Sequence, residues 1–303
     1  MRIAVTGATG FIGGAVAAAA ESEGWEVIRF ARHHGEGLTH WDIRGLPPAR
    51  LPHVDAVVHA AALVADWGDS RAFHHANVLG TRAVVEAFAG TRLVHISSSS
   101  VYPWWRPCVD RGEEEVSTNH LNAYARSKAL ADVEARSHGN AVALRPHGVY
   151  GSGDRTLLPR LINNIQRGRL LTVGHPGVQH QLTNISNLVA AVLAACRAEL
   201  RGAVNVADAE PVLLADVLRQ VLDETGHPQT RIRYIPWSAA MAVAGASEAL
   251  ALCTGRAPRL TRYAVSQLGQ DRTYRLDRLR EGPGVEPIST TLADAGKWLE
   301  RGA

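Results

Sequence analysis

The sequence predicts an α/β protein built on a doubly wound parallel sheet, followed by a smaller and mostly helical region. In residues 1–150, short apolar runs alternate with helical stretches, as in consecutive βαβ units. Beyond Gly151 the apolar runs become shorter and helical stretches dominate. We therefore divide the chain into units of residues 1–150 and 151–303, and we expect a segment near 179–206 to return to the first sheet.

The individual elements follow from the period of their apolar residues. The strands expected in the first unit are 2–6, 25–30, 54–59, 93–97 and 141–145, and the clearest helices are 15–20, 70–88 and 123–137. In the second unit we expect helices at 157–167, 187–196, 212–225 and from 237 onward, with short strands at 170–173, 204–206 and 231–235. Ligands of such sheets bind at the carboxyl ends of the strands, so the residues just after the strands are candidates for function.

Composition limits the range of partners. The 303 residues include 32 Lys and Arg against 29 Asp and Glu, a net charge of +3, which gives no reason to expect nucleic acid as a partner. Cys108, Cys196 and Cys253 are widely spaced and form no C-x-x-C pair, which favours reduced thiols in the cytoplasm. No cluster has the spacing of a metal site. We expect no signal peptide, because the first strand starts at residue 2, and we expect a monomer or a homodimer.

The longest apolar segment, residues 239–253, includes Ser247 and Glu248 and is short for a membrane span. We therefore expect no transmembrane helix. A peripheral amphipathic helix is an alternative, but packing in the core or against a pocket is the preferred interpretation.

The first expected strand runs into three glycines, Gly7, Gly10 and Gly13, directly before a helix. Such a turn directs several backbone N–H groups and the positive end of the helix dipole at one point, which suits a pyrophosphate. Glycines also occur in ordinary turns, so the spacing G-x-x-G-x-x-G needs support from the rest of the chain.

That support comes from a second group of residues. Tyr124 and Lys128 are four residues apart in an expected helix, which puts both on one face. An ammonium close to a phenol lowers the pKa of the phenol, so we expect Tyr124 to exchange a proton with an alcohol or ketone. A run of serines, residues 97–100, follows the fourth strand and could bond the same substrate oxygen.

Taken together, these motifs resemble the extended short-chain dehydrogenases/reductases, which have a Rossmann domain, over essentially the whole chain. The matching segments are Thr6–Gly13, Asp42-Ile43, Val57–Ala61, Asn77–Thr81, Ser97–Tyr102 and Tyr124–Lys128. The resemblance implies Ser98 as the catalytic hydroxyl, with Ser99 as the alternate, and Tyr124 as the acid/base. It implies that Lys128 lowers the pKa of Tyr124 and holds the nicotinamide ribose. The cofactor contacts that it implies are Gly7, Thr9, Gly10, Phe11, Ile12, Gly13, Arg32, Asp42, Ile43, Ala60, Ala61, Tyr124, Lys128, Pro146 and Val149.

The second strand predicts NADP as the cofactor, in preference to NAD. Enzymes that use NAD place a carboxylate just after this strand, whereas here the chain continues with Arg32 and has no carboxylate before Glu36. The planar guanidinium of Arg32 suits a 2′-phosphate. Arg29 is a weaker candidate, and a solvated surface charge is the alternative for Arg32.

The segment 144–154 and the tail resemble the branch that contains 3β-hydroxysteroid dehydrogenases and bacterial 2-alkyl-3-oxoalkanoate reductases. Sugar-nucleotide enzymes of the family usually carry Asn at the position of His147 and Arg at the position of His180-Gln181, to hold a diphosphate. Their absence favours a ketone or secondary alcohol on a mainly hydrophobic molecule. Ser186 stands where the branch usually has Asp.

The resemblance and the loop after the serines suggest a substrate pocket. We expect substrate contacts from Ser99, Trp104, Trp105 and His147, with residues 237–263 as a further wall. One of the two tryptophans could instead fill the core. Two other functions stay open: a nucleotide-sugar epimerase/dehydratase, and a non-catalytic regulator that binds NADP.

Overall fold

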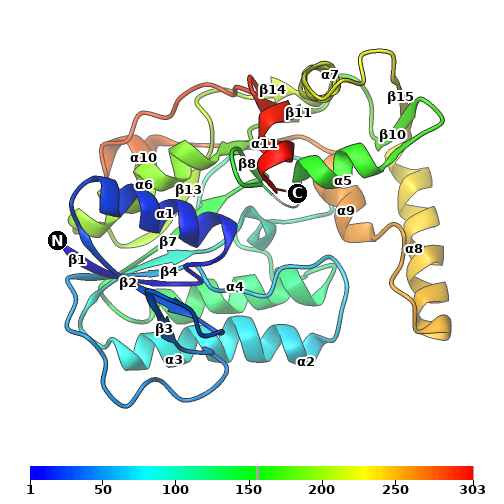
Figure 1. Ribbon diagram of the computed structural model, residues 1–303. Helices are drawn as coiled ribbons and strands as arrows, with labels where there is room; N and C mark the ends of the chain where they lie inside the picture. The colour runs from blue at the N-terminus through cyan, green and yellow to red at the C-terminus, as the bar shows by residue number, and fades with distance from the viewer. Residues whose placement is uncertain (155–156, 303) are drawn as a thin grey trace.

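The computed structural model describes residues 1–154 and 157–302, with side chains as far as Trp298. Its centre is a seven-stranded, wholly parallel sheet in the order β13-β7-β5-β4-β1-β2-β3 (Figure 1). The strands are β1 Arg2–Thr6, β2 Glu26–Ala31, β3 Leu38–His40, β4 Ala56–His59, β5 Arg92–Ile96, β7 Ala141–Pro146 and β13 Gly202–Val206. The expected parallel sheet is confirmed, and β13 is the late strand that returns to it.

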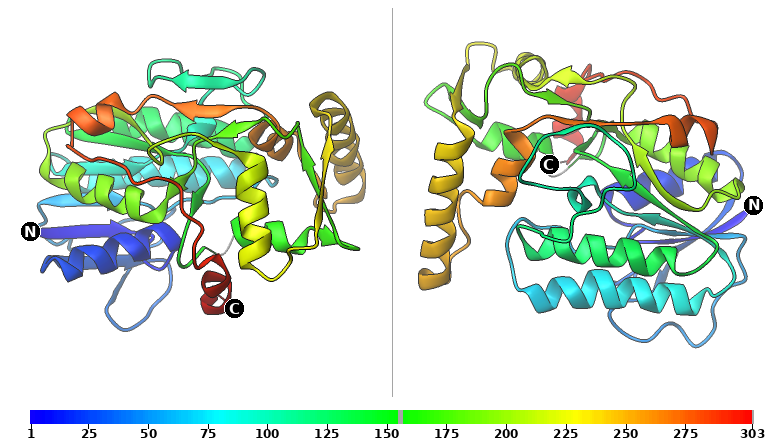
Figure 2. Two further views of the ribbon diagram at one scale, coloured as in Figure 1. Left: turned by 90° about the horizontal axis from the view of Figure 1, so that it is seen from above. Right: turned by 180° about the vertical axis from the view of Figure 1, so that it is seen from behind.

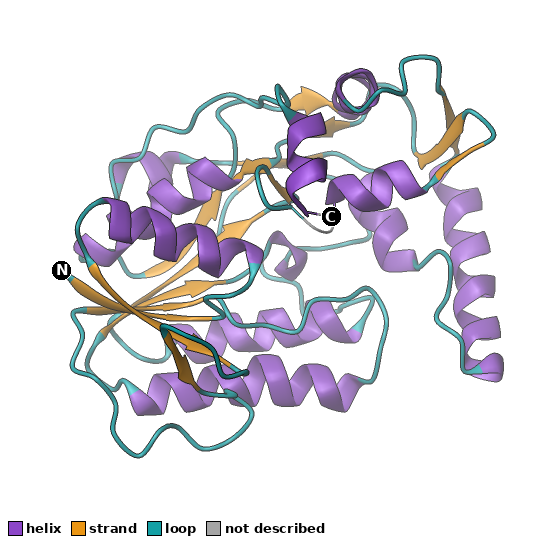
Figure 3. Ribbon diagram, viewed as in Figure 1, coloured by secondary structure: helices purple, strands orange, loops and turns teal. Residues whose placement is uncertain are grey.

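Helices cover both faces of this sheet (Figure 3). One face carries α1 Phe11–Ser22 and α6 Ile185–Arg197, and the other carries α3 Gly80–Ala87 and α4 Ala123–Arg136. The expected helix 70–88 is three consecutive pieces, because α2 Ser70–Phe73 continues through a π-helical turn, His74–Leu79, into α3. Asn77 lies in this π turn and its side chain bonds to Ser127 of α4 and to the backbone of Leu63.

The C-terminal region is mixed and not mostly helical. It has a three-stranded sheet, β9 Ile165–Gln166, β10 Arg169–Val173 and β15 Arg231–Ile235, and the parallel pair β8 Val149–Tyr150 and β12 Thr183–Asn184. A four-stranded sheet contains β14 Val212–Leu213, β11 Gln179–His180, β16 Arg272–Tyr274 and β6 Cys108–Arg111. The helices are α5 Leu157–Asn163, α7 Leu214–Glu224, α8 Trp237–Thr254, α9 Arg262–Leu268, α10 Asp277–Glu281 and α11 Ala295–Gly302. Strands this short carry too little periodicity to be predicted from sequence.

Each unit contributes elements to the other. β6, from the first unit, pairs with β16 of the second. From the second unit, β13 is a strand of the seven-stranded sheet and α6 packs against that sheet. Ser186 lies in the first turn of α6 and its side chain is exposed. It therefore takes no part in the buried contacts of this region. The buried carboxylate of this neighbourhood is Asp208, which accepts hydrogen bonds from the backbone of Asn184 and the side chain of Asn187.

Helix α8 stands out from the body of the protein (Figure 2). Its 18 residues are long and apolar enough to cross a membrane by length and composition alone, and only 17% of them are buried. The buried residues are Ala240, Ala244 and Ala251. The expectation that this segment packs in the core or against a pocket is therefore wrong for its outer side, whereas Gly245, Glu248, Ala249 and Leu252 do line a pocket.

Candidate active site

The turn between β1 and α1 is so tight that only glycine fits at positions 7 and 13. Gly7 has a φ of +69°, and a Cβ there would lie 2.8 Å from the backbone of Ala61. A Cβ on Gly13 would lie 2.3 Å from the carbonyl oxygen of Gly7. No side chain of the described chain caps α1 at Gly10, and the first turn holds no acidic residue. The start of α1 therefore suits the pyrophosphate of a dinucleotide.

The other residues expected in this turn lie around the same opening. Thr9 and Gly10 are exposed, whereas Phe11 and Ile12 are half-buried. A Cβ on Gly153 would be 3.5 Å from the ring of Phe11, so this ring lies against the loop that follows β8. The glycine turn is thus in contact with both parts of the chain.

A buried histidine fixes the backbone opposite the glycines. Thr81 donates to the carbonyl of Asn77, so its oxygen accepts from Nε2 of His59 at 3.0 Å, and Nδ1 of His59 accepts from Thr6 at 2.7 Å. Burial, helped by the charge of Lys128, lowers the pKa of His59 to about 3, so the ring is neutral. The Thr6 oxygen also receives the N–H of Ala61, which holds Ala60 and Ala61 beside Gly7.

The residues expected at the adenosine end lie just beyond β2 and β3. Arg32 is exposed and forms no ion pair with any described residue, whereas Arg29 is paired with Glu21. Asp42 accepts from the guanidinium of Arg44, which lowers the pKa of its carboxyl to about 2. Arg32 is therefore the cation left available at this edge.

Ile43, the other residue expected to hold adenine, is buried. It packs on α3, where a Cβ on Gly80 would lie 2.8 Å from its side chain. Pro146 ends β7 and Val149 begins β8, both at the carboxyl edge of the sheet.

Helix α4 presents Tyr124 and Lys128 one turn apart, as predicted. Asn122 caps the helix by accepting from the N–H of Ala125. The Lys128 ammonium donates to the carbonyl of Ile96 at 2.7 Å, and burial lowers its pKa to about 8. Burial raises the pKa of Tyr124, and a hydrogen bond with Ser98 opposes this rise. The prediction that Lys128 lowers the pKa of Tyr124 is therefore wrong here, because the ammonium bonds to a backbone carbonyl and burial dominates.

A buried ion pair holds α4 against the strand that carries the serines. Arg145 of β7 donates two hydrogen bonds of 2.9 Å to Asp132 of α4, and Ser97 donates to the same carboxylate at 2.6 Å. Arg145 and Asp132 are almost fully buried. This network fixes the end of β5 relative to Tyr124, which fixes where Ser98 emerges.

The next two serines have different partners. Ser98 begins a short 3₁₀ turn, Ser99–Val101, and its oxygen accepts from the N–H of Ser100 at 3.1 Å. Its hydroxyl hydrogen therefore stays available toward Tyr124. Ser99 lies 2.9 Å from Nδ1 of His147 and is buried.

The hydrogen bond from Ser99 is the first of a series that runs through two stacked imidazole rings, those of His147 and His180. Nε2 of His147 is 3.3 Å from Nδ1 of His180, whose Nε2 is 3.3 Å from the carbonyl oxygen of Leu268. A carbonyl only accepts, so His180 carries its proton on Nε2, His147 donates to His180, and Ser99 donates to His147. Burial lowers the pKa of His180 to about 4 and that of His147 well below its usual range. Ser99 thus has no hydrogen free for a substrate, and Ser98 is the serine beside Tyr124.

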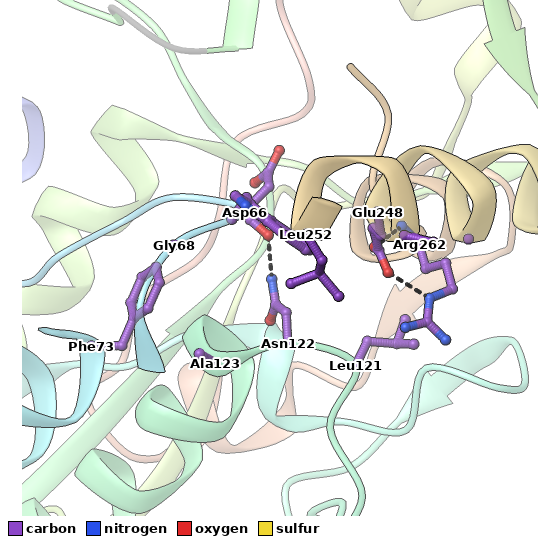
Figure 4. Close-up of a pocket in the computed structure, with 12 residues that line it drawn as sticks. Asp66, Gly68, Phe73, Leu121, Asn122, Ala123, Glu248, Leu252 and Arg262 are labelled. Atoms are coloured by element: carbon purple, nitrogen blue, oxygen red, sulfur yellow. Dashed lines mark hydrogen bonds and ion pairs between the residues drawn. The ribbon is translucent and has the colours of Figure 1, made fainter. Parts of the chain in front are cut away.

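A cleft of about 370 Å³ opens at the start of α4, beside Asn122 and Ala123 (Figure 4). One side is the loop and helix starts of the first unit, and the other side is α8. The lining residues are Asp66, Trp67, Gly68, Phe73, Leu121, Asn122, Ala123, Gly245, Glu248, Ala249, Leu252 and Arg262. The ring of Phe73 also contacts the ring of Tyr124, with centroids 6.2 Å apart, so a residue of the cleft wall packs against Tyr124.

The charges at the cleft are already paired. Arg262 donates to Glu248 through its backbone N–H and its Nε, both at 2.7 Å. Asp66 is bonded to Arg160 at 3.0 Å. The cleft therefore offers apolar side chains and neutralised ion pairs rather than free cations.

The expected walls are only partly correct. Residues of 237–263 do line the cleft, but Trp104, Trp105 and His147 do not. His147 is buried in the histidine chain, and Trp105 is 45% exposed. Trp104 lines a separate space of about 10 Å³, close to Tyr263. The aromatic pair is turned away from the cleft because the following residues pair as β6 with the C-terminal sheet.

Sequence reasoning missed the cleft residues that come from the first unit, such as Phe73 of α2, whose ring contacts Tyr124. Tyr263 of α9, which lies in the expected segment 237–263, contacts the ring of Tyr124 at 5.9 Å but lines the smaller space beside Trp104. Glu248 was the one sequence signal that pointed to this cleft, because a single carboxylate inside an apolar helix needs a partner. Its partner, Arg262, lies 14 residues further on, across a turn that no periodicity reveals.

Residues 3–207 match the NAD dependent epimerase/dehydratase family, and this span contains the glycine turn, the serines and Tyr124. The chain belongs to this family. A 2-alkyl-3-oxoalkanoate reductase of Stenotrophomonas maltophilia is 31% identical over 316 residues, which cover 95% of each chain. A ketoreductase of Stigmatella aurantiaca that acts on a farnesylated dihydroquinoline oxide is 30% identical, over 94% of this chain and 91% of that one.

The fold of the family extends to sugar-nucleotide enzymes. The structure of MoeE5 in complex with UDP-glucose and NAD superposes with a TM-score of 0.74 over 99% of both chains, at 22% identity. Such a likeness shows a shared fold and not a shared substrate. With the relatives above, the family makes this protein an NAD(P)-dependent oxidoreductase of the extended short-chain dehydrogenase/reductase type.

Proposed function

We propose that this protein is an NADPH-dependent ketoreductase that interconverts a ketone and a secondary alcohol on a mainly hydrophobic small molecule. The observation that carries the proposal is the pair Tyr124 and Ser98 beside a cleft whose arginine is already paired with a carboxylate. The two ketoreductases at 30–31% identity support the same reaction class.

The side chains divide the proton chemistry between them. Tyr124 donates its phenolic proton to the carbonyl oxygen, since burial keeps the phenol protonated at neutral pH. Ser98 donates a hydrogen bond to the same oxygen, and the chain from Ser99 to His180 holds the serine turn in place. Lys128, one helical turn from Tyr124, is left to hold the nicotinamide ribose with its ammonium, as the resemblance to the family implies. When bound, the nicotinamide supplies the hydride.

Arg32 supports NADPH over NADH. Its guanidinium is exposed and has no carboxylate partner among the described residues, so it can bind a 2′-phosphate. Asp42 is ion-paired with Arg44, and the charge of Arg32 adds to the lowering of the pKa of its carboxyl without an ion pair between the two. NAD is the less favoured cofactor.

The cleft supports an apolar substrate. A diphosphate placed there would lack a free cation, and burying unpaired charge is costly. An apolar ligand instead gains on the order of 25 cal/mol for each Å² that it hides.

The test is NADPH oxidation with a panel of hydrophobic ketones and 2-alkyl-3-oxo acids, with NADH and Tyr124→Phe as controls. The proposal expects turnover with at least one hydrophobic ketone. Turnover of a UDP- or dTDP-sugar instead would favour an epimerase/dehydratase, and tight NADPH binding with no turnover of any ketone would favour a regulator.

A further inference from the structure

We propose that this protein docks on the surface of an anionic lipid bilayer through one lobe, residues 164–177 and 230–262. The lobe contains β10, β15 and α8, which lie along one side of the molecule in Figures 1 and 2. We call it the arginine lobe.

The net positive charge of the protein is concentrated in the arginine lobe. It holds seven arginines and a single carboxylate, Glu248, which is paired with Arg262. The remaining six are exposed and form no ion pair with any described residue: Arg167, Arg169, Arg231, Arg233, Arg256 and Arg259. The rest of the chain has 25 of the 32 Lys and Arg against 28 of the 29 Asp and Glu, so it is slightly acidic.

The strand register puts several of these arginines on one surface. Arg169 of β10 is the partner of Arg231 of β15, and Leu171 is the partner of Arg233. The alternate residues, Leu170 and Ile232, face the other way and join a cluster with α7. The outward face of the ribbon is therefore cationic, with Leu171 61% exposed in its midst.

β15 leads directly into α8, whose outer face is apolar. Val243 and Leu250 are 60% and 63% exposed and share one flank of the helix, about a quarter turn from its buried alanines. Ala239, Ala242 and Ala246 are exposed on the same side. Glu248 is the only charged residue of α8, and it lines the cleft. The outer face, about 27 Å long, thus carries no charge.

A lipid surface fits this arrangement better than a second copy of the chain. Arginines bracket the apolar face, with Arg231 and Arg233 before α8 and Arg256 and Arg259 after it. Two copies meeting at this face would bring these cations together, which is unfavourable. A protruding apolar helix flanked by arginines instead suits the interface plane of a bilayer, where long side chains reach the phosphates.

Co-sedimentation with lipid vesicles tests the proposal. We expect binding to equal parts of phosphatidylcholine and phosphatidylglycerol, little binding to phosphatidylcholine alone, and release by high salt. Arg231→Gln with Arg233→Gln should weaken binding by about fivefold for each arginine. Arg50→Gln with Arg201→Gln removes two exposed, unpaired arginines elsewhere in the described chain and should change little.

A second pair of variants tests the apolar face. Val243→Ser with Leu250→Ser should also weaken vesicle binding, whereas Leu46→Ser with Val109→Ser, which are 92% and 62% exposed, should not. Vesicle binding that is absent, or equally strong on neutral lipid, would overturn the proposal. So would a dimer seen by ultracentrifugation that the first pair abolishes, because a second copy would then cover α8. None of these measurements depends on ketone turnover.

Discussion

The glycine turn and the cleft beside α8 are built in different ways. The turn is one continuous stretch of backbone, in which Gly7 and Gly13 leave room that any Cβ would fill. The cleft is assembled from side chains far apart in the sequence, with Phe73 on one wall and Glu248 and Leu252 on the other. The dinucleotide site is therefore specified locally, whereas the cleft depends on long-range packing.

The difference bears on what each region can change. An added methyl group at Gly13 meets backbone and has no way to move aside. A changed side chain on α8 alters the wall of the cleft and leaves the sheet untouched, because α8 packs mainly on α9. Substrate choice can therefore vary on a fixed cofactor site.

The largest effect is expected at Tyr124, where the two regions meet. Tyr124→Phe removes only the proton donor, and we expect kcat to fall by about 10²–10⁴-fold. NADPH binding, measured by fluorescence titration, should stay close to that of the wild type. Residual turnover above about a tenth of wild type would assign the proton to another group.

A substitution at Arg32 tests the cofactor region alone. Arg32→Asp should weaken NADPH binding by about 10–100-fold and improve NADH, since a carboxylate repels the 2′-phosphate and accepts from the ribose. Arg29→Gln, at a position already paired with Glu21, is the matched control and should keep the NADPH preference. Equal KM values for NADH and NADPH in the wild type would contradict the role of Arg32.

The pH dependence tests Lys128. Burial lowers the pKa of Lys128 to about 8, so its ammonium is charged below this pH and lost as the pH rises through it. We expect kcat/KM to fall above about pH 8, by at most tenfold per pH unit. The folded state holds this proton less tightly than the unfolded chain, so the contribution of Lys128 to stability increases over the same range.

The matched control is Lys128→Arg, which keeps a positive charge at this position up to high pH. The affinity of this variant for NADPH should no longer fall between pH 8 and about 10. A wild-type profile that is flat to about pH 10 would mean that Lys128 keeps its ordinary pKa.

The smallest effect is expected at the ion pair of the cleft. Glu248→Gln leaves Arg262 unpaired, and we expect a loss of about 0.2–1 kcal/mol in stability, as for other partly exposed pairs. Activity on an apolar ketone should fall a few-fold, and inhibition by pyrophosphate should increase. The double variant Glu248→Gln with Arg262→Gln restores neutrality and should reverse the inhibition; if it does not, the pair has no role in the cleft.

Most of the fold could be predicted from the sequence, and less of the site. The strands of the parallel sheet, Tyr124 and Lys128 follow from period and spacing, which act over a few residues. The tryptophans were misplaced because the pairing of β6 with β16 brings together residues more than 160 apart. The hydrogen-bonded series from Ser99 through His147 to His180 could not be predicted from the sequence either, since it depends on how two sheets meet. Burial also reversed the expected shift in the pKa of Tyr124.

The most direct test of the central claim is calorimetry of the cleft with NADPH present. The titrants are UDP-glucose and dTDP-glucose, with a hydrophobic ketone that the enzyme turns over as the reference. A neutral cleft in which Arg262 is held by Glu248 predicts heat from the ketone and none from either nucleotide sugar. Micromolar binding of UDP-glucose or dTDP-glucose would contradict the apolar cleft and favour an epimerase.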